Sequence, residues 1–98
     1  MRHATPAALD QLEAVLLELR RLGLLREKKR GAFYRGSNAF LHFHEDPAGL
    51  FADVKLDGKD FTRRRVDTQA EQGALVAAVR RALTARSAPR SRAAARRS

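Results

Sequence analysis

The fold is decided by residues 39–56, which read AFLHFHEDPAGLFADVKL. Two runs of alternating apolar and polar residues, 39–45 and 50–56, flank a four-residue segment that begins with Asp46-Pro47 and ends with Gly49. Alternation with a period of two is typical of half-buried strands, and Asp, Pro and Gly are typical of turns. This stretch therefore predicts two antiparallel strands joined by a tight connection.

The pleat of these strands assigns their side chains to two faces, because successive residues of a strand point to opposite sides. One face is purely apolar and should be covered by helices; it carries Ala39, Leu41, Phe43, Leu50, Ala52, Val54 and Leu56. The other face is mixed, and it receives Phe40, His42, His44, Phe51, Asp53 and Lys55.

Further strands are expected on both sides of this pair. Residues 32–35 alternate in the same way and are followed by a turn at 36–38, while Asp57-Gly58 is a strong hairpin signal before a fourth strand at 60–66. The charged segment 27–30 is interpreted as a connector.

A helix is predicted at each end of the strand region. Thr5-Pro6 is a good helix start, and leucines then recur at three- and four-residue steps up to residue 22. Thr68 and Glu71 form a capping box for a second helix that should end near Arg86. The sequence thus predicts an α+β fold: a two-layer sandwich of helix, four-stranded antiparallel sheet and helix, with both helices on one sheet face.

The 98 residues suffice for one domain, assigned to residues 1–86, followed by a disordered arginine-rich tail at 87–98. The net charge is +9, and residues 86–98 hold five of the arginines and no acid. The chain has no cysteine, no apolar run long enough to span a bilayer and no secretory leader pattern. We therefore expect a cytoplasmic protein without a membrane partner.

Two histidines, His42 and His44, point the same way from one strand, and Asp53 is expected across the ladder. Such residues are ligands for zinc-like ions, but a zinc site needs three or four ligands. His3 is too far from any predicted element to be counted. We therefore predict no metal and no cofactor, and the chain contains none of the common catalytic motifs, so enzymatic activity is not favoured.

The mixed sheet face, with Phe40 and Phe51 among its histidines, is a candidate interface or ligand surface. Packing against another element or formation of a homodimer is favoured over stacking of nucleic-acid bases. The alternative function for the protein is accordingly a metal-binding, small-molecule-binding or protein-interaction domain that uses Phe40, His42, His44, Phe51 and Asp53.

The leading hypothesis is a non-enzymatic binding module that contacts nucleic acid or another polyanion without sequence specificity. Clustered arginines and lysines bind phosphates electrostatically. The candidate contact residues are Lys28, Lys29, Arg30, Arg63, Arg65, Arg90, Arg92, Arg96 and Arg97.

Residues 40–54 resemble a segment, FLHFHEDPAGLFADV, of small uncharacterised bacterial proteins to which no activity is assigned. The order of helix, strands and helix over residues 6–85 is similar to that of the YjbR-like double-wing proteins and, more remotely, of frataxin. The resemblance implies the topology, and no functional residue is carried over from it.

Overall fold

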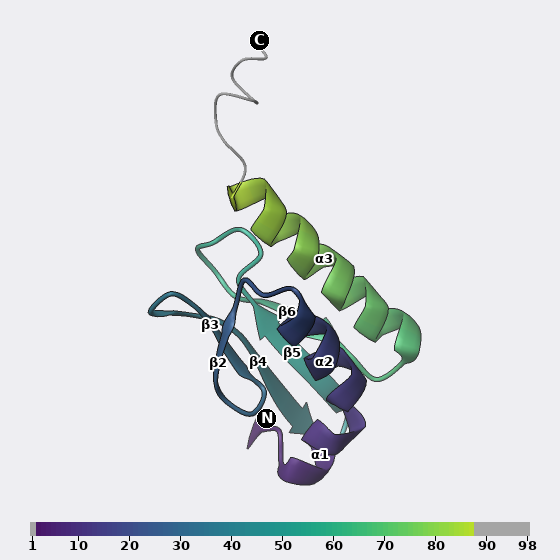
Figure 1. The fold of residues 1–98 in the computed structure, drawn as a ribbon. Coiled ribbons are helices and arrows are strands. Elements are labelled where there is room, and N and C mark those ends of the chain that lie inside the picture. Colours follow the sequence, from purple (N-terminus) through teal and green to yellow (C-terminus); the bar gives the residue numbers. More distant parts are fainter. Residues whose placement is uncertain (1, 88–98) are drawn as a thin grey trace.

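The two alternating runs form the centre of an antiparallel sheet in the computed structural model, which describes residues 2–87 (Figure 1). They are β4 (Asn38–Asp46) and β5 (Gly49–Val54). β3 (Ala32–Arg35) pairs with β4, and β6 (Thr62–Arg65) pairs with β5. β2 (Arg26–Lys29) completes the order β2-β3-β4-β5-β6. The short β1 (Arg2–His3) also pairs with β4.

The helices are α1 (Pro6–Gln11), α2 (Glu13–Arg21) and α3 (Gln69–Ser87). In Figure 1, α2 and α3 lie side by side in front of the sheet, and the apolar side of the sheet packs against them. The predicted α+β sandwich with helices covering one sheet face is confirmed. Among the described residues, no helix is both long and apolar enough to cross a bilayer.

Both helix starts form as their sequences predict. The Thr5 hydroxyl accepts a hydrogen bond from the Ala8 amide at 3.3 Å. Thr68 and Glu71 form a reciprocal capping box, with the Glu71 amide 3.1 Å from the Thr68 hydroxyl and the Thr68 amide 3.0 Å from the Glu71 carboxylate. The first helical segment is not continuous, because Leu12, with φ −99° and ψ 7°, separates α1 from α2.

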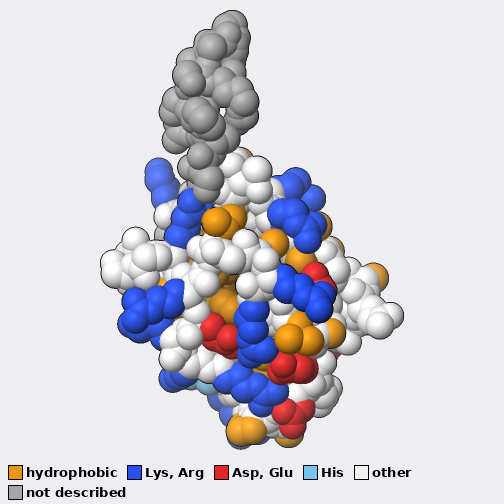
Figure 2. Space-filling model, viewed as in Figure 1, with side chains coloured by type: hydrophobic (Ala, Val, Ile, Leu, Met, Phe, Trp, Pro, Cys, Tyr) orange, Lys and Arg blue, Asp and Glu red, His pale blue; other side chains and the backbone are white. Residues whose placement is uncertain are grey.

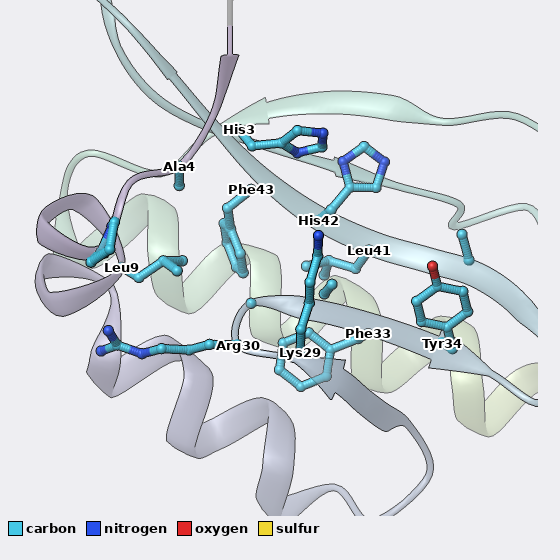
Figure 3. A pocket seen from close by; sticks show the side chains of 14 residues that line it. His3, Ala4, Leu9, Lys29, Arg30, Phe33, Tyr34, Leu41, His42 and Phe43 are labelled. Carbon is cyan, nitrogen blue, oxygen red and sulfur yellow. The ribbon is translucent and has the colours of Figure 1, made fainter.

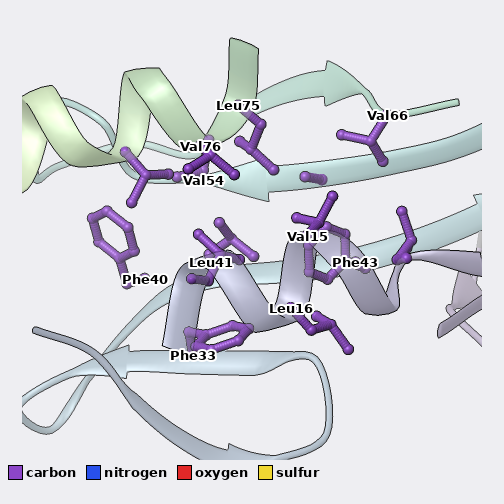
Figure 4. Packing of buried hydrophobic residues seen from close by; sticks show 14 of the residues in the cluster. Val15, Leu16, Phe33, Phe40, Leu41, Phe43, Val54, Val66, Leu75 and Val76 are labelled. Atoms are coloured by element: carbon purple, nitrogen blue, oxygen red, sulfur yellow. The ribbon is translucent and has the colours of Figure 1, made fainter. Parts of the chain in front are cut away.

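The core lies between the helices and the sheet (Figure 4). Its members come from every layer and are fully or almost fully buried: Leu9, Leu12, Val15, Leu16, Leu19, Phe33, Phe40, Leu41, Phe43, Ala52, Val54, Val66, Leu75, Val76, Val79 and Leu83. The apolar face predicted for β5 is therefore confirmed, as are Leu41 and Phe43 on β4.

Phe40 is a correction to the predicted faces. Its side chain is only 2% exposed and lies in the core, although simple alternation places it on the opposite face (Figure 4). The register gives the reason: Phe33 pairs with Leu41 and Tyr34 with Ala39, so β4 has one extra residue at Phe40. This β-bulge lets both Phe40 and Leu41 point inward and turns Ala39 to the other face.

The number and bounds of the strands also differ from the prediction. The charged segment interpreted as a connector is β2, an edge strand, and charged residues are common on exposed edges. The last strand begins at Thr62 and follows a connection that contains Asp57-Gly58, so the hairpin is longer than a two-residue turn. Of the predicted tail, Ser87 is the last residue of α3, and residues 88–98 lie outside the described part of the chain.

Candidate metal centre on the helix-free sheet face

Three imidazoles meet on the face of the sheet that no helix covers. They belong to His3, His42 and His44, which are all the histidines of the chain. One ring nitrogen of each lies within 4.8 Å of the corresponding nitrogens of the other two. We call this group the histidine cluster.

β4 places two members of the histidine cluster. His42 and His44 are two residues apart on one strand, so their side chains leave the same face. The Nδ1 atom of His42 lies 2.7 Å from the Nε2 atom of His44, and the rings meet edge to face with their centroids 4.7 Å apart. The sequence pattern predicted this pair correctly.

β1 supplies the third member, which corrects the prediction that His3 is too distant to count. His3 pairs with His44 in the ladder, and their rings stack with centroids 5.0 Å apart. The following residue continues the attachment, because the Ala4 amide donates to the Phe43 carbonyl at 3.1 Å.

Glu45 fixes this N-terminal segment to β4. Its Oε1 atom accepts hydrogen bonds from the Thr5 amide at 2.6 Å and the Thr5 hydroxyl at 2.8 Å, and its Oε2 atom lies 3.3 Å from Nη2 of Arg2. These donors lower the pKa of Glu45, with the Thr5 amide making the largest contribution. The ionised carboxylate thus binds Arg2 and Thr5, the residues on either side of the His3-Ala4 pair.

Asp53 brings a carboxylate to the edge of the histidine cluster. It pairs with His42 across the ladder, and its Oδ2 atom lies 3.3 Å from Nε2 of His44. Arg63 donates two hydrogen bonds to it, at 2.9 and 3.0 Å, and so lowers the pKa of the Asp53 carboxyl. The side chains of His44 and Asp53 are each 13% exposed, so this ionised carboxylate is largely shielded from water.

The surroundings of His42 favour the uncharged form of its ring. Burial lowers the pKa of His42, and the neighbouring His44 acts in the same direction. Phe61 packs edge-on against the ring, with centroids 4.9 Å apart. A neutral imidazole presents a lone pair, which is the form that binds metal ions.

The geometry of the histidine cluster is close to that of a metal site. Zinc binds imidazole nitrogen at about 2.0–2.1 Å, which in a tetrahedral site separates two ligand nitrogens by roughly 3.3 Å. The nitrogens of His42 and His44 are 2.7 Å apart, so small rotations of the two rings would open the required space. Three histidines with a fourth position left to another ligand is a known arrangement for zinc.

The predicted basic residues in the described part of the chain lie at opposite edges of the sheet: Lys28, Lys29 and Arg30 are on or next to β2, and Arg63 and Arg65 are on β6. Arg30 lies 2.9 Å from both Asp10 and Glu13, Arg63 is bound to Asp53, and Arg65 lies 2.6 Å from Asp67. Lys28 lies over the ring of Tyr34 at 4.5 Å, and Lys29 is exposed. Arg90, Arg92, Arg96 and Arg97 lie outside the described residues.

Figure 2 shows the helix-covered side of the molecule, where blue basic groups alternate with red acidic groups over the lower half. On the opposite sheet face, Phe51 is half-buried and the Arg65 guanidinium covers its ring at 4.8 Å. Since Phe40 is in the core, the apolar patch predicted for this face shrinks to Phe51 and the 42% exposed Phe61. Phe61 was not among the predicted site residues.

Comparison of the chain with models of protein families, with curated proteins and with solved structures found no match. The resemblances noted in the sequence therefore stay predictions.

Proposed function

We propose that the protein is a non-enzymatic metal-binding module in which His3, His42 and His44 hold one divalent ion of the zinc class. The observation that carries this proposal is the convergence of every histidine in the chain on one point of the sheet surface. Two of these residues come from β4 and one from a segment about 40 positions earlier, so their meeting depends on the tertiary fold.

The ligand chemistry favours the zinc class over hard cations. Imidazole nitrogen suits zinc, copper, iron and nickel, whereas calcium and magnesium prefer oxygen ligands. Asp53 adds a negative charge that favours a cation here, because its ionised carboxylate stands beside the same Nε2 atom of His44 that faces His42. The Asp53 carboxylate stands 3.3 Å from His44 and is itself held by Arg63.

The nucleic-acid hypothesis stays a prediction and takes second place. Arg30, Arg63 and Arg65 are each engaged with carboxylates of the same chain, which reduces the charge they offer to phosphates. A salt titration separates the two functions. Polyanion binding weakens steeply with salt through counterion release, whereas imidazole coordination does not release counterions from a polyanion.

Calorimetric titration of the full chain with Zn²⁺ tests the proposal. We expect saturation at one ion per chain, and loss of any one imidazole in H3A, H42A or H44A should weaken binding at least about tenfold, the lower end of what loss of an outer partner costs. The matched control is E18Q, because Glu18 is an acid on α2 bound to Arg21 at 3.0 Å. It should bind zinc as the wild type does.

Absence of saturable binding by the wild type would overturn the proposal, as would wild-type affinity in all three histidine variants. Two further expectations accompany it: a location in the cytoplasm, and a second role of the same sheet face in forming a homodimer. Sedimentation of the metal-free and zinc-loaded protein would measure the second.

A further inference from the structure

A pocket of about 650 Å³ adjoins the histidine cluster (Figure 3). His3 and His42 line it on one side and Lys29 and Tyr34 on the other, while its deep wall is formed by core residues such as Phe43. Two of the three proposed metal ligands therefore face the metal site and the pocket at the same time.

The pocket exists because small residues stand where larger ones would fill the sheet face. Ala32 pairs with His42, and Ala39 pairs with Tyr34, so both alanines lie between bulky neighbours on the helix-free face. β1 and β3 also share one edge of β4, because β5 occupies the other edge over residues 41–46. The core residues Leu41 and Phe43 of β4 also line the pocket, so the hollow reaches the core at this edge.

The turn that closes this hollow requires glycine. Gly31 has φ +81°, and a Cβ atom there would lie 2.7 Å from Cδ2 of Leu9, another residue that lines the pocket. A side chain at this position would therefore strain the turn and press on the pocket wall.

The lysine and arginine side chains that line the pocket have no acidic counterpart in its lining. Its lining residues include Lys29 and Arg30 but no aspartate or glutamate. Arg30 is bound to Asp10 and Glu13, so its charge is balanced from outside the pocket. Lys29 forms no ion pair with any residue in the described part of the chain, and Figure 3 shows its ammonium group directed toward His42.

We propose that this pocket binds a small monocarboxylate with a flat apolar body, whose carboxylate contacts the Lys29 ammonium and completes the coordination of the metal ion. The inference rests on the proposed metal site, since three imidazoles leave a fourth position for an exogenous ligand. His3 and His42 border the pocket, which places that position on the pocket side.

The chemistry of the walls selects this ligand class. The Lys29 ammonium, which has no ion pair among the described residues, matches one negative charge, and a carboxylate oxygen is a normal ligand for zinc. The body of the ligand would lie over Ala32 and Ala39 and stack against the ring of Tyr34. Offset or edge-to-face packing of rings is favourable, so an aromatic acid fits this slot better than a branched aliphatic one.

The test uses benzoate as the probe and its neutral relative benzamide as the matched ligand. Their affinities for the full chain are measured by amide chemical shifts, with and without one equivalent of Zn²⁺. We expect zinc to strengthen benzoate binding about tenfold or more, the usual worth of a charge-assisted contact, with little effect on benzamide. The strongest shifts should be at Ala32, Tyr34 and Ala39.

Two variants locate the site. K29M removes the ammonium but keeps most of the apolar stem, and it should weaken benzoate binding about tenfold. K59M makes the same charge change at an exposed loop residue that does not line the pocket, and it should bind benzoate as the wild type does. A39L fills the hollow and should weaken benzoate and benzamide alike.

The outcomes separate this inference from the proposed function. If the chain binds zinc but benzoate affinity is the same with zinc, without zinc and in K29M, the pocket proposal is wrong and the metal module stands. If the wild type does not bind zinc at all, the proposed function fails and the metal-bound carboxylate fails with it. Equal affinity for benzoate and benzamide in the zinc-loaded protein would also overturn the inference.

Discussion

Replacement of Phe40 by alanine tests the β-bulge that separates the observed sheet from simple alternation. Phe40 is 2% exposed and packs in the core, and truncation of such a phenylalanine costs about 3–5 kcal/mol in the free energy of unfolding. For a chain of this size, that loss would lower the melting temperature by roughly 15–30 °C. Urea unfolding followed by circular dichroism measures it.

Phe51 is the matched control, because strict alternation assigns it to the same face as Phe40. It is half-buried on the helix-free face, where the Arg65 guanidinium lies over its ring, so F51A should cost less than about 1.5 kcal/mol. F40L keeps most of the apolar volume and provides a graded variant if F40A does not fold. Equal losses in F40A and F51A, or a negligible loss in F40A, would refute the bulge and restore the simple alternation.

Three further predictions concern the site and the sheet edge. E45Q should weaken zinc binding about tenfold by releasing the segment that carries His3, as calorimetry would measure. D53N should weaken it by about 10- to 100-fold through loss of the negative charge beside the ion. Arg20 holds the pKa of Glu27 below its ordinary value of 4.5, so the ionised carboxylate stabilises the folded state above that pH and loses this effect as the pH falls through the folded-state pKa. E27Q should therefore be less stable than the wild type at pH 7, and the difference should vanish in acid.

Each of these three predictions would be contradicted by a specific result. Unchanged zinc affinity in E45Q would mean that His3 reaches the ion without its anchor or does not bind it. Unchanged zinc affinity in D53N would show that the Asp53 carboxylate does not contribute to zinc binding. A stability difference between the wild type and E27Q that is the same at pH 3 and pH 7 would show that the Glu27 carboxylate acts through packing alone.

Much of the architecture could be predicted because local patterns specified it. The strands around Asp46-Pro47, the capping box of Thr68 and Glu71 and the helix start at Thr5 all formed as expected. The bulge at Phe40 could not be predicted, since the consecutive apolar residues Phe40 and Leu41 fit a mixed sheet face as well as a bulge. β2 was missed for a related reason: an edge strand contributes little to the core, so its residues need not alternate.

The site residues likewise separate into those that local patterns could place and one that they could not. His42, His44 and Asp53 could be placed together because the hairpin register follows from one turn. His3 could not, because a two-residue strand has no periodicity and pairs only through tertiary contacts. Glu45, an acid near the end of β4, accepts two hydrogen bonds from Thr5 and so attaches the segment that carries His3. This role of Glu45 can be recognised only in the folded structure, where the helix start lies beside β4.

Metal binding by this module would be coupled to the pairing of β1 with β4. His42 and His44 are neighbours in any extended chain, but His3 joins them only when β1 is paired with β4. A third imidazole adds affinity only in the folded state, so metal binding and the pairing of β1 must stabilise each other. Ala4 and Thr5 follow His3 directly and lead into α1, and Ala4 also lines the pocket. An ion held by the histidine cluster would thus tie down the N-terminal wall of the pocket, and the carboxylate site would be complete only when the metal is bound.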